Sequence, residues 1–392
     1  MEDVFVLSAV RTPIGKYGGG LASVPPSDLA AAVVREAVSR AGVDPDQVGH
    51  AVFGNVLHTE KRDMYLSRVA AVNGGLPVGT PALTVNRLCG SGLQAIVSAA
   101  QAVRLGDCEV AVAGGAESMS RGQYWLPGMR WGQRMQDGVV VDAMVGALTD
   151  PFDSCHMGVT AENVASDFGI SRADQDALAV ESHRRAAAAA EAGYFAKQIT
   201  PIEVKDRKGT VTVDADEHIR PGVTADDLAK LRPSFARDGT VTPGNASGVN
   251  DAAAAVVIAS GSFASERGLR PLGRLVAYSH AGVEPRIMGM GPVPAVRKVL
   301  DRAGLKLDEI DLFEVNEAFA AQAVAVIREL GLPPDRTNPN GSGVSLGHPI
   351  GATGTILTVK ALYELHRTGG RYALTTMCIG GGQGIAAIFE RM

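Results

Sequence analysis

Cys89 is the residue of this chain with the strongest case for covalent chemistry. It lies in residues 84–93, TVNRLCGSGL, where glycines permit a tight turn and a helix begins at once. The N-terminus of a helix favours the thiolate, and its free backbone N–H groups can hold an oxyanion. An isolated cysteine is more often a small buried hydrophobic residue, but the glycine-rich turn favours a nucleophile here.

His348 and Cys378 also stand in unusual surroundings. His348 precedes Pro349 and a second glycine-rich helix start, and an imidazole within reach of a thiol is the recurring means of activating sulfur. Cys378 ends an apolar strand and enters three glycines, 380–382, which let the backbone approach a ligand closely. Taken alone, this loop could hold a phosphate or form a tight turn.

Asn316 follows a short apolar strand in the segment 312–319, LFEVNEAF. An amide at this point could orient water or donate to a developing oxyanion. It could equally be the N-cap of the helix that follows, and the spacing does not decide between these interpretations.

An internal repeat accounts for the placement of these residues. Residues 34–42 match residues 296–304 without a gap, each as a helix closed by glycine, and each leads through an acidic turn into a short strand. The helix starts at Cys89 and His348 are 259 residues apart, close to the offset of 262 between the first two segments. We therefore expect two β/α halves with mixed sheets, and Cys89 and His348 at equivalent positions facing one seam.

An insertion of different texture separates the halves. It carries both tryptophans, several methionines and a helix predicted from Ser171 to about Ala192, with a capping-box start and Gly193 as its stop. We expect a first half of 1–120 with 249–270, an insertion of 121–248 that grips ligand, and a second half of 271–392. His183, within the predicted helix, carries no signal of a site and is expected at the surface.

Bulk properties exclude several classes of function. A net charge of −5 gives no basic footprint for nucleic acid, and no apolar run reaches the roughly 18 residues of a membrane span. The four cysteines form no C-x-x-C pair, so a metal site is not expected. The glycine-rich loops match neither a P-loop nor a dinucleotide fingerprint. The start lacks the signature of a signal peptide, which predicts a cytoplasmic protein.

Taken together, the motifs resemble the thiolase family. Four of them occur in the family's order: 86–92 (NRLCGSG), 316–319 (NEAF), 347–351 (GHPIG) and 378–382 (CIGGG). The resemblance covers nearly the whole chain. It implies an α/β fold of two pseudo-symmetric αβαβα halves with an inserted loop domain over the active site. It also implies a homo-oligomer, either a dimer or a tetramer.

The resemblance further implies the role of each residue. Cys89 would take the acyl group, and His348 would activate it and help to bind the thioester oxygen. Asn316 would hold a water in that oxyanion hole, and Cys378 would move the α-proton of the second acyl-CoA. The backbone N–H groups of Cys89 and Gly380 would form the other oxyanion hole.

The implied substrates are coenzyme A and short-chain acyl-CoA thioesters, with no cofactor and no metal. Contacts with coenzyme A are implied for Leu148, His156, Met157, Arg220, Phe235, Ser247, Met288, Ala318 and Phe319. Arg220 would favour the nucleotide phosphates, and the apolar members would line the pantetheine tunnel. The segment 340–345, NGSGVS, departs from the commoner family pattern and resembles bacterial β-ketothiolases that accept 3-oxoacyl groups of four and five carbons.

Three other functions are weighed against this one. A decarboxylating condensing enzyme would share the fold and nucleophile, but such enzymes typically place a histidine or asparagine where this chain has Cys378. A non-catalytic acyl-CoA-binding protein would not need Cys89, His348 and Cys378 together. A cysteine hydrolase would leave Cys378 without a purpose.

Overall fold

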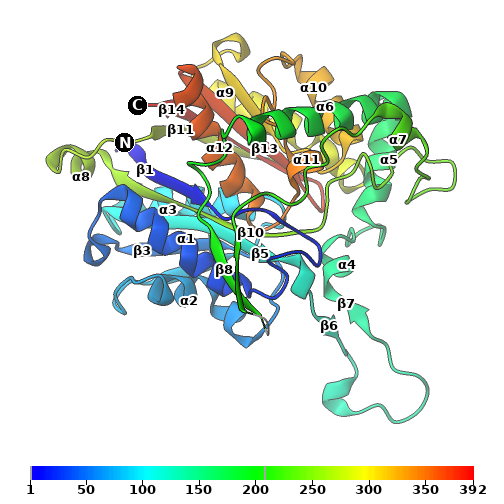
Figure 1. Cartoon of the computed structure of the whole chain (residues 1–392), viewed down its shortest axis with the longest axis horizontal. Coiled ribbons are helices and arrows are strands. Elements are labelled where there is room, and N and C mark those ends of the chain that lie inside the picture. The colour runs from blue at the N-terminus through cyan, green and yellow to red at the C-terminus, as the bar shows by residue number, and fades with distance from the viewer. Residues whose placement is uncertain (1, 207–208) are drawn as a thin grey trace.

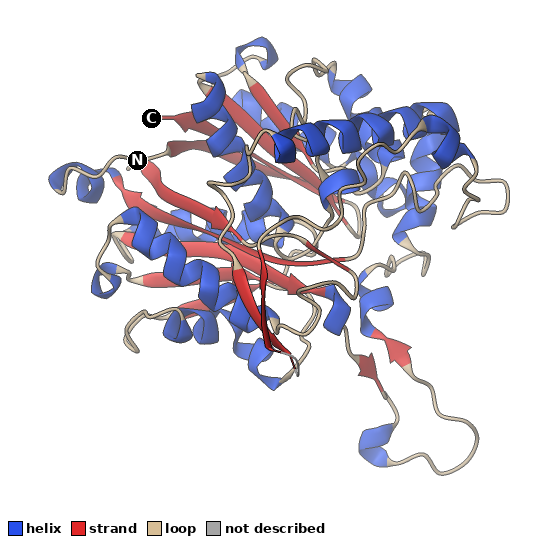
Figure 2. Cartoon of the chain, in the orientation of Figure 1, coloured by secondary structure: helices blue, strands red, loops and turns tan. Residues whose placement is uncertain are grey.

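The computed structural model describes residues 2–206 and 209–392, and its strands fall into two similar groups (Figures 1 and 2). The first group comprises β1 (Val4–Arg11), β2 (Gly15–Lys16), β3 (His50–Gly54), β4 (Ala82–Val85), β5 (Val110–Ser118) and β10 (Asn250–Ser260). The second comprises β11 (Gly273–Gly282), β12 (Leu312–Val315), β13 (Tyr372–Ile379) and β14 (Gln383–Arg391).

The two groups have the same connections, which confirms the predicted fold of paired halves. In the first, β3, β5, β10 and β1 are neighbours in that order, and in the second β12, β13, β14 and β11 are. The first pair in each order is parallel and the other two pairs are antiparallel. In the part of the chain that the structure describes, the groups join through two residue pairs, Phe5 with Arg274 and Val6 with Gly273.

Helices complete a five-layered arrangement. The helices of the halves are α1 (Pro26–Ala41), α2 (Leu66–Asn73), α3 (Ser91–Leu105), α8 (Gly261–Glu266), α9 (Pro292–Ala303), α10 (Ala320–Leu330), α11 (Gly343–Leu346) and α12 (Thr353–Thr368). Helices α3 and α12 pack between the two groups of strands in the central core. Helices α1 and α2 cover the outer face of the first group, and α9 and α10 cover that of the second.

The strand β10 shows why the central strands are apolar along their whole length. Alternate residues such as Ala254 and Val256 face the core around α3 and α12, whereas Ala255 and Val257 face α1. Because both faces are covered, every residue of β10 is buried, and the sequence NDAAAAVVIAS lacks the alternation of a half-exposed strand. The strand β10 lies between β1 and β5, within the first group of strands.

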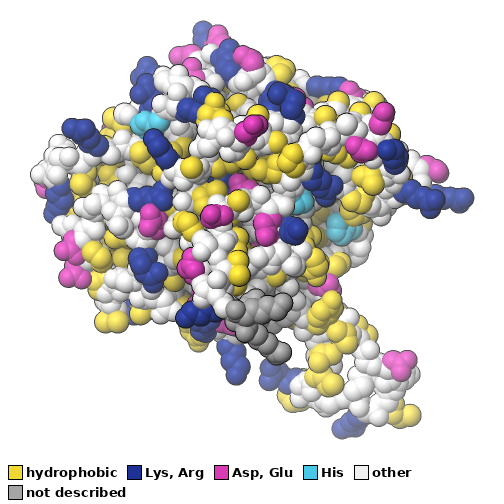
Figure 3. All heavy atoms as spheres, viewed as in Figure 1, with side chains coloured by type: hydrophobic (Ala, Val, Ile, Leu, Met, Phe, Trp, Pro, Cys, Tyr) yellow, Lys and Arg dark blue, Asp and Glu magenta, His cyan; other side chains and the backbone are white. Residues whose placement is uncertain are grey.

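Residues 121–248 lie outside this arrangement. They form β6 (Tyr124–Trp125), β7 (Val141–Asp142), α4 (Ala143–Ala147), α5 (Met157–Asp167), α6 (Arg172–Glu191), β8 (Ile202–Asp206), β9 (Gly209–Val213) and α7 (Ala225–Ala229). The predicted capping box of α6 is present, with Ser171 and Asp174 bonded reciprocally. An arm made of β6, β7 and the chain between them projects from the body, with apolar side chains along its surface (Figures 1 and 3).

Two expectations about position were wrong. Cys89 lies two residues before α3 begins at Ser91, whereas His348 lies five residues before α12 begins at Thr353. The residue that matches Cys89 in position is therefore Gly351, and a turn separates His348 from the helix. His183 was expected at the surface, but it is 2% exposed because it lies on the face of α6 that packs against the body.

Candidate active site

Cys89 lies in the tight turn between β4 and α3. Leu88, the preceding residue, has φ of 45°, a left-handed conformation that is uncommon for leucine. The hydroxyl of Ser91 donates to the Leu88 carbonyl at 2.6 Å and accepts from the Arg87 amide at 2.9 Å, which fixes the turn. The thiolate of Cys89 would accept from the N–H groups of Gly380 and of Cys89 itself.

The electrostatic balance at Cys89 differs from the expected one. Burial raises the pKa of its thiol to about 11, and the charge of Glu117 adds to the increase. The two N–H donors and the start of the helix favour the thiolate but do not outweigh burial. The resting group is therefore a thiol, so that a base must remove its proton before it can act as a nucleophile.

Cys378 lies opposite, at the end of β13. It is fully buried, and burial followed by the charge of Cys89 raises the pKa of its thiol far above the usual range. The turn from β13 to β14 contains Gly381 and Gly382 at φ of 80° and 83°, which side-chain-bearing residues rarely adopt. Arg87 donates to the Gln383 side chain at 3.2 Å and so ties this turn to the loop of Cys89.

The close approach of these two loops requires Gly90. A Cβ atom at this position would lie 2.6 Å from the Cδ1 atom of Ile379, the residue after Cys378. The absence of a side chain at Gly90 therefore allows the loops that carry the two cysteines to pack closely.

His348 is held as a neutral imidazole with one defined tautomer. Its Nδ1 atom is 2.7 Å from the hydroxyl of Thr353, which itself donates to the Pro349 carbonyl at 3.0 Å. Because that hydroxyl has used its proton, it accepts from Nδ1–H and leaves Nε2 unprotonated. Burial lowers the pKa of His348 to about 4. The Nε2 atom is thus a free base at neutral pH.

Asn316 faces this base. Its Nδ2 atom lies 3.4 Å from His348 Nε2, and its Oδ1 atom is buried without a hydrogen-bonding partner among the described residues. Helix α10 begins at Ala320 with Phe319 as its N-cap, so the N-cap interpretation of Asn316 is wrong. The amide is instead available to a ligand or a water molecule.

A cavity of about 260 Å³ opens beside these groups. It is lined by Met119, Leu148, His156, Ser234, Phe235, Thr242, Pro243, Ala246, Ser247, Gly248, Val249, Phe319, His348 and Ile350. Five of the nine residues expected to contact coenzyme A are among them. Met119 and Ile350 also belong to the apolar cluster against which Cys89 packs, so the cavity leads toward the thiol.

An aromatic wall shapes the cavity. The rings of His156 and Phe235 stack with centroids 4.7 Å apart, and Phe235 meets Phe319 edge to face at 6.2 Å. His156 caps α5 by accepting from the Gly158 amide at 3.0 Å. A side chain on Gly158 would overlap the Phe235 ring, so this glycine sets the position of the wall.

The other four residues expected at coenzyme A lie outside the cavity lining. Met157 and Met288 are buried, and the Met157 side chain packs beside Gly380. Ala318 is buried and accepts from the Ser247 amide at 3.0 Å. Arg220 is exposed, and its backbone amide donates to His183 Nδ1 at 3.1 Å.

Sequence reasoning missed several lining residues. Ser234, Pro243 and Val249 carry no chemical signature, although each lies within a few residues of a predicted contact. Ile350 lies within the motif 347–351, and that motif was the available signal, although sequence reasoning gave Ile350 no contact of its own.

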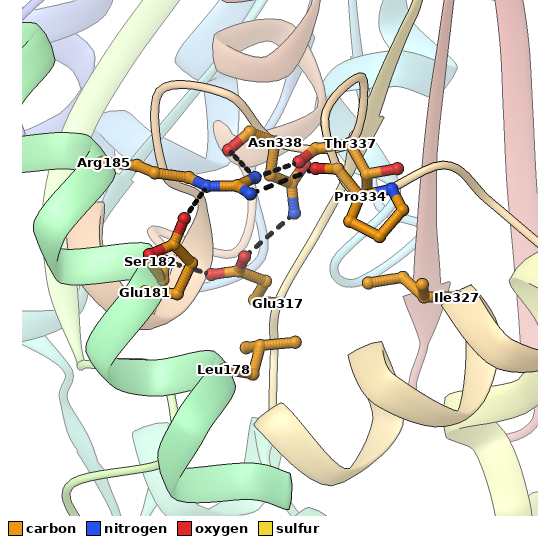
Figure 4. A pocket seen from close by; sticks show the side chains of 9 residues that line it. All are labelled: Leu178, Glu181, Ser182, Arg185, Glu317, Ile327, Pro334, Thr337 and Asn338. Carbon is orange, nitrogen blue, oxygen red and sulfur yellow. Dashed lines mark hydrogen bonds and ion pairs between the residues drawn. The ribbon is translucent and has the colours of Figure 1, made fainter. Parts of the chain in front are cut away.

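A second cavity, of about 160 Å³, lies behind Glu317, the neighbour of Asn316 (Figure 4). Glu317 is buried there and accepts from the Ser182 hydroxyl at 2.6 Å and from the Asn338 amide at 2.9 Å. Arg185 spans the opposite wall and donates to the Thr337 carbonyl at 2.6 Å. These bonds join α6 of the insertion to the chain that carries Asn316.

Comparison with known proteins agrees with this geometry. A family model described as thiolase, N-terminal domain, matches residues 4–262, and one described as thiolase, C-terminal domain, matches residues 269–391. The chain belongs to the thiolase family. It is therefore an enzyme of the acyltransferase class. The two models together cover almost the whole chain.

The relatives of this thiolase are similar over their entire length. It is 65% identical over 392 residues to beta-ketothiolase BktB of Cupriavidus necator, covering all of both chains. It is 49% identical to an acetyl-CoA acetyltransferase of Chromobacterium violaceum over 99% of this chain and all of the relative. The crystal structure of Bacillus anthracis acetyl-CoA acetyltransferase matches with a TM-score of 0.98 at 47% identity. That of human mitochondrial 3-ketoacyl-CoA thiolase matches with a TM-score of 0.98 at 46% identity, and each match covers 100% of this chain and 99% of the other.

Proposed function

We propose that this thiolase catalyses the reversible Claisen condensation of an acyl-CoA with acetyl-CoA, and in reverse the cleavage of short-chain 3-oxoacyl-CoA by coenzyme A. The observation that carries the proposal is the meeting of two cysteines, one neutral imidazole and an asparagine whose side-chain oxygen has no partner among the described residues, next to the cavity that His348 lines. The names of the relatives support the same substrates.

In the cleavage direction, His348 Nε2 takes the proton of the Cys89 thiol. The sulfur attacks the 3-oxo carbon, the bond between C2 and C3 breaks, and its electron pair stays on C2 as the enolate of acetyl-CoA. Cys378 donates its proton to C2, since its raised pKa keeps it protonated until that carbanion forms. The products of this half are acetyl-CoA and acyl-Cys89.

In the second half, the Cys378 thiolate accepts the proton of the coenzyme A thiol. The coenzyme A sulfur attacks the acyl carbonyl, and Cys89 leaves and recovers its proton from His348. The N–H groups of Cys89 and Gly380, which are directed at Cys89 Sγ, would hold the acyl oxygen in this step. His348 and a water on the Asn316 amide would hold the thioester oxygen of the enolate.

Coenzyme A would bind along the aromatic wall and the loop 242–249. Residues 121–248, which carry most of these contacts, would form a loop domain. Leu148, His156, Phe235, Ser247 and Phe319 would contact the pantetheine chain. Met157, Met288 and Ala318 would support these contacts from behind, and the exposed Arg220 would meet the phosphates outside the cavity. The proposed steps use only thiols, an imidazole and amides, so they call for no metal or redox cofactor.

The experiment follows loss of the magnesium–enolate absorbance of acetoacetyl-CoA and 3-oxovaleryl-CoA in the presence of coenzyme A. Wild type should cleave both substrates, and Cys89→Ala and Cys378→Ala should each fail. Near-normal turnover by Cys378→Ala would contradict the role of that thiol. Turnover of acetoacetyl-CoA alone would contradict only the proposed acyl range, which the apolar surroundings of Cys89 support.

We also propose that the chain forms a homo-oligomer. The strand β4 is the end of the sheet and leaves one edge unpaired, with Leu83 46% exposed on it. An unpaired apolar edge is a ready site for strand pairing with a second copy. The arm exposes a second apolar surface made of Tyr124, Trp125, Leu126, Met129, Trp131 and Met135 (Figure 3).

Light scattering after size exclusion tests the assembly. We expect a tetramer for wild type and a dimer for Trp131→Ser, since Trp131 is 89% exposed at the end of the arm. A monomeric wild type would contradict the proposal.

We place the enzyme in the cytoplasm because the proposed mechanism needs two reduced thiols, and Cys89 and Cys378 are both free.

A further inference from the structure

Glu117 is a buried carboxylate close to the site that the proposed mechanism does not use. It lies near the end of β5 and is 0% exposed. It does not line the cavity of about 260 Å³. A charged group held fully inside a protein is costly unless it is well paired, which calls for an account of its partners.

Four N–H donors surround this carboxylate. Its Oε1 atom accepts from Asn55 Nδ2 at 3.1 Å and from the Leu57 amide at 3.0 Å. Its Oε2 atom accepts from the Val56 amide at 3.1 Å and from the Gly351 amide at 2.8 Å. Burial raises the pKa of Glu117 to about 8, whereas the donated bonds favour the charged form. Since every partner is a donor, both oxygens act only as acceptors and the bonded form is the carboxylate.

The bond to Gly351 is the shortest of the four and crosses between the halves. Glu117 and residues 55–57 belong to the first half, whereas Gly351 belongs to the second and follows His348 by three residues. Between them lies Ile350, which lines the cavity. The fit is tight, because a Cβ atom on Gly351 would lie 2.5 Å from Glu117 Oε2.

The segment that carries His348 has two further anchors. The Asn250 side chain on β10 accepts from the His348 amide at 2.9 Å. Glu317, whose bonds to Ser182 and Asn338 appear in Figure 4, accepts from the Val344 amide at 3.3 Å. Of these anchors, Glu117 is the one that fixes the segment on the far side of the imidazole.

We propose that Glu117 is a positioning residue for His348, holding residues 348–351 against the first half through the amide of Gly351. The inference rests on the proposed role of His348 in acyl transfer. Without this bond, the imidazole and Ile350 are free to move away from Cys89. A displacement of about 1 Å at a reacting group can lower a rate by about 100-fold.

The charge of Glu117 gives the proposal a distinctive signature. That charge raises the pKa of Cys89, so its removal should make the thiol easier to ionise. Alkylation of Cys89 by iodoacetamide needs only the thiolate, whereas acetylation by acetyl-CoA also needs His348 in place. Glu117→Gln should therefore slow the acetylation of this sulfur without slowing its alkylation.

The experiment measures both rates at pH 8 by mass spectrometry of the peptide that contains Cys89, because the other cysteines are also free thiols. We expect Glu117→Gln to slow acetylation about 10-fold and to leave alkylation as fast as in wild type or faster. The matched control is Glu217→Gln, which also removes a carboxylate bonded to backbone amides, those of Lys16 and Gly20, but away from the cavity. The control should leave both rates within about twofold of wild type, as expected for a surface change.

Glu117→Asp tests the length of the side chain separately from its charge. It keeps the charge but withdraws the carboxylate by one methylene, so acetylation should slow while alkylation does not become faster. Equal acetylation rates in wild type and both variants would overturn the proposal. An equal loss of both reactions in Glu117→Gln would also overturn it, because that result indicates general damage to the fold.

A measurement on the wild type covers the case in which neither variant folds. The amides of His348 and Gly351 should exchange with deuterium far more slowly than those of the exposed segment 137–140, although both segments are loops. Exchange as fast as in 137–140 would overturn the proposal. A wild type that takes no acetyl group on Cys89 would instead refute the proposed function.

Discussion

Replacing Lys360 by methionine should destabilise this thiolase strongly and in a pH-dependent way. Lys360 is 1% exposed on α12, and its Nζ atom donates to Glu314 Oε2 at 2.7 Å and to the Gly341 carbonyl at 2.5 Å. The other oxygen of Glu314 has no hydrogen-bonding partner among the described residues. The substitution therefore leaves a fully buried carboxylate with neither a counter-charge nor a donor.

The size of the loss follows from the chemistry of such pairs. Removing one partner of a buried ion pair costs about 3–5 kcal/mol, because the remaining charge stays desolvated. Burial already raises the pKa of Glu314 to about 7 despite the attraction of Lys360. Stability from this group is thus present below the pKa of about 4.3 of an unfolded glutamate and decreases as pH rises through 7. The loss caused by Lys360→Met should be larger at pH 8 than at pH 6.

The assay is equilibrium unfolding by urea at one protein concentration, since assembly contributes to apparent stability. Lys298→Met is the control, because Lys298 is exposed and its removal should cost under about 0.5 kcal/mol. The double variant Glu314→Gln/Lys360→Met should recover most of the loss. A single variant within about 1 kcal/mol of wild type at pH 8, or a double variant no more stable than the single one, would refute the reasoning.

Three further predictions concern the site. Gly158→Ala should displace the ring of Phe235 and raise the KM for coenzyme A about 10-fold with little change in kcat. The control is Gly79→Ala, which has open space for its Cβ and should have no effect in the same steady-state assay. Thr353→Val removes the hydroxyl that fixes the tautomer of His348 and should lower kcat about 10-fold, while a kcat equal to wild type would show that the tautomer does not depend on this bond. Four buried or half-buried histidines, His348 among them, have a pKa lowered to about 4, so their contribution to stability is present above about pH 6.5 and lost toward pH 4. Because Glu314 gains stability over the same range, the check is the titration of each imidazole by NMR, where a pKa near 6.5 would contradict the prediction.

The halves and most of the chemical groups could be predicted because their signals are local. Repeated helices closed by glycine indicated the duplication. Asn316 and Cys378 were singled out because each lies at the end of a predicted strand. His348 was expected at the site for a partly wrong reason, since its alignment with Cys89 assumed that the two helices begin at the same distance from these residues. The turn at 349–352 breaks that correspondence, and its geometry is set by contacts with the other half.

Features that depend on packing between distant segments of the chain could not be predicted from the sequence. The hydrogen bond between Gly351 and Glu117 joins residues 234 positions apart, and no local pattern specifies such a contact. The raised pKa of Cys89 likewise follows from the surfaces that enclose it. The sequence indicated only the helix start beside it, which favours the thiolate. His183 was misplaced because its burial depends on which face of α6 meets the body.

Among the described residues, the two groups of strands share only two residue pairs, yet the groups of the proposed mechanism come from both. Cys89 is supplied by one copy of the duplicated unit, and His348, Asn316 and Cys378 by the other. In that mechanism neither copy can act by itself, so the internal symmetry of the fold carries a division of labour. Turnover then depends on the contact surface between the copies as well as on the reacting side chains.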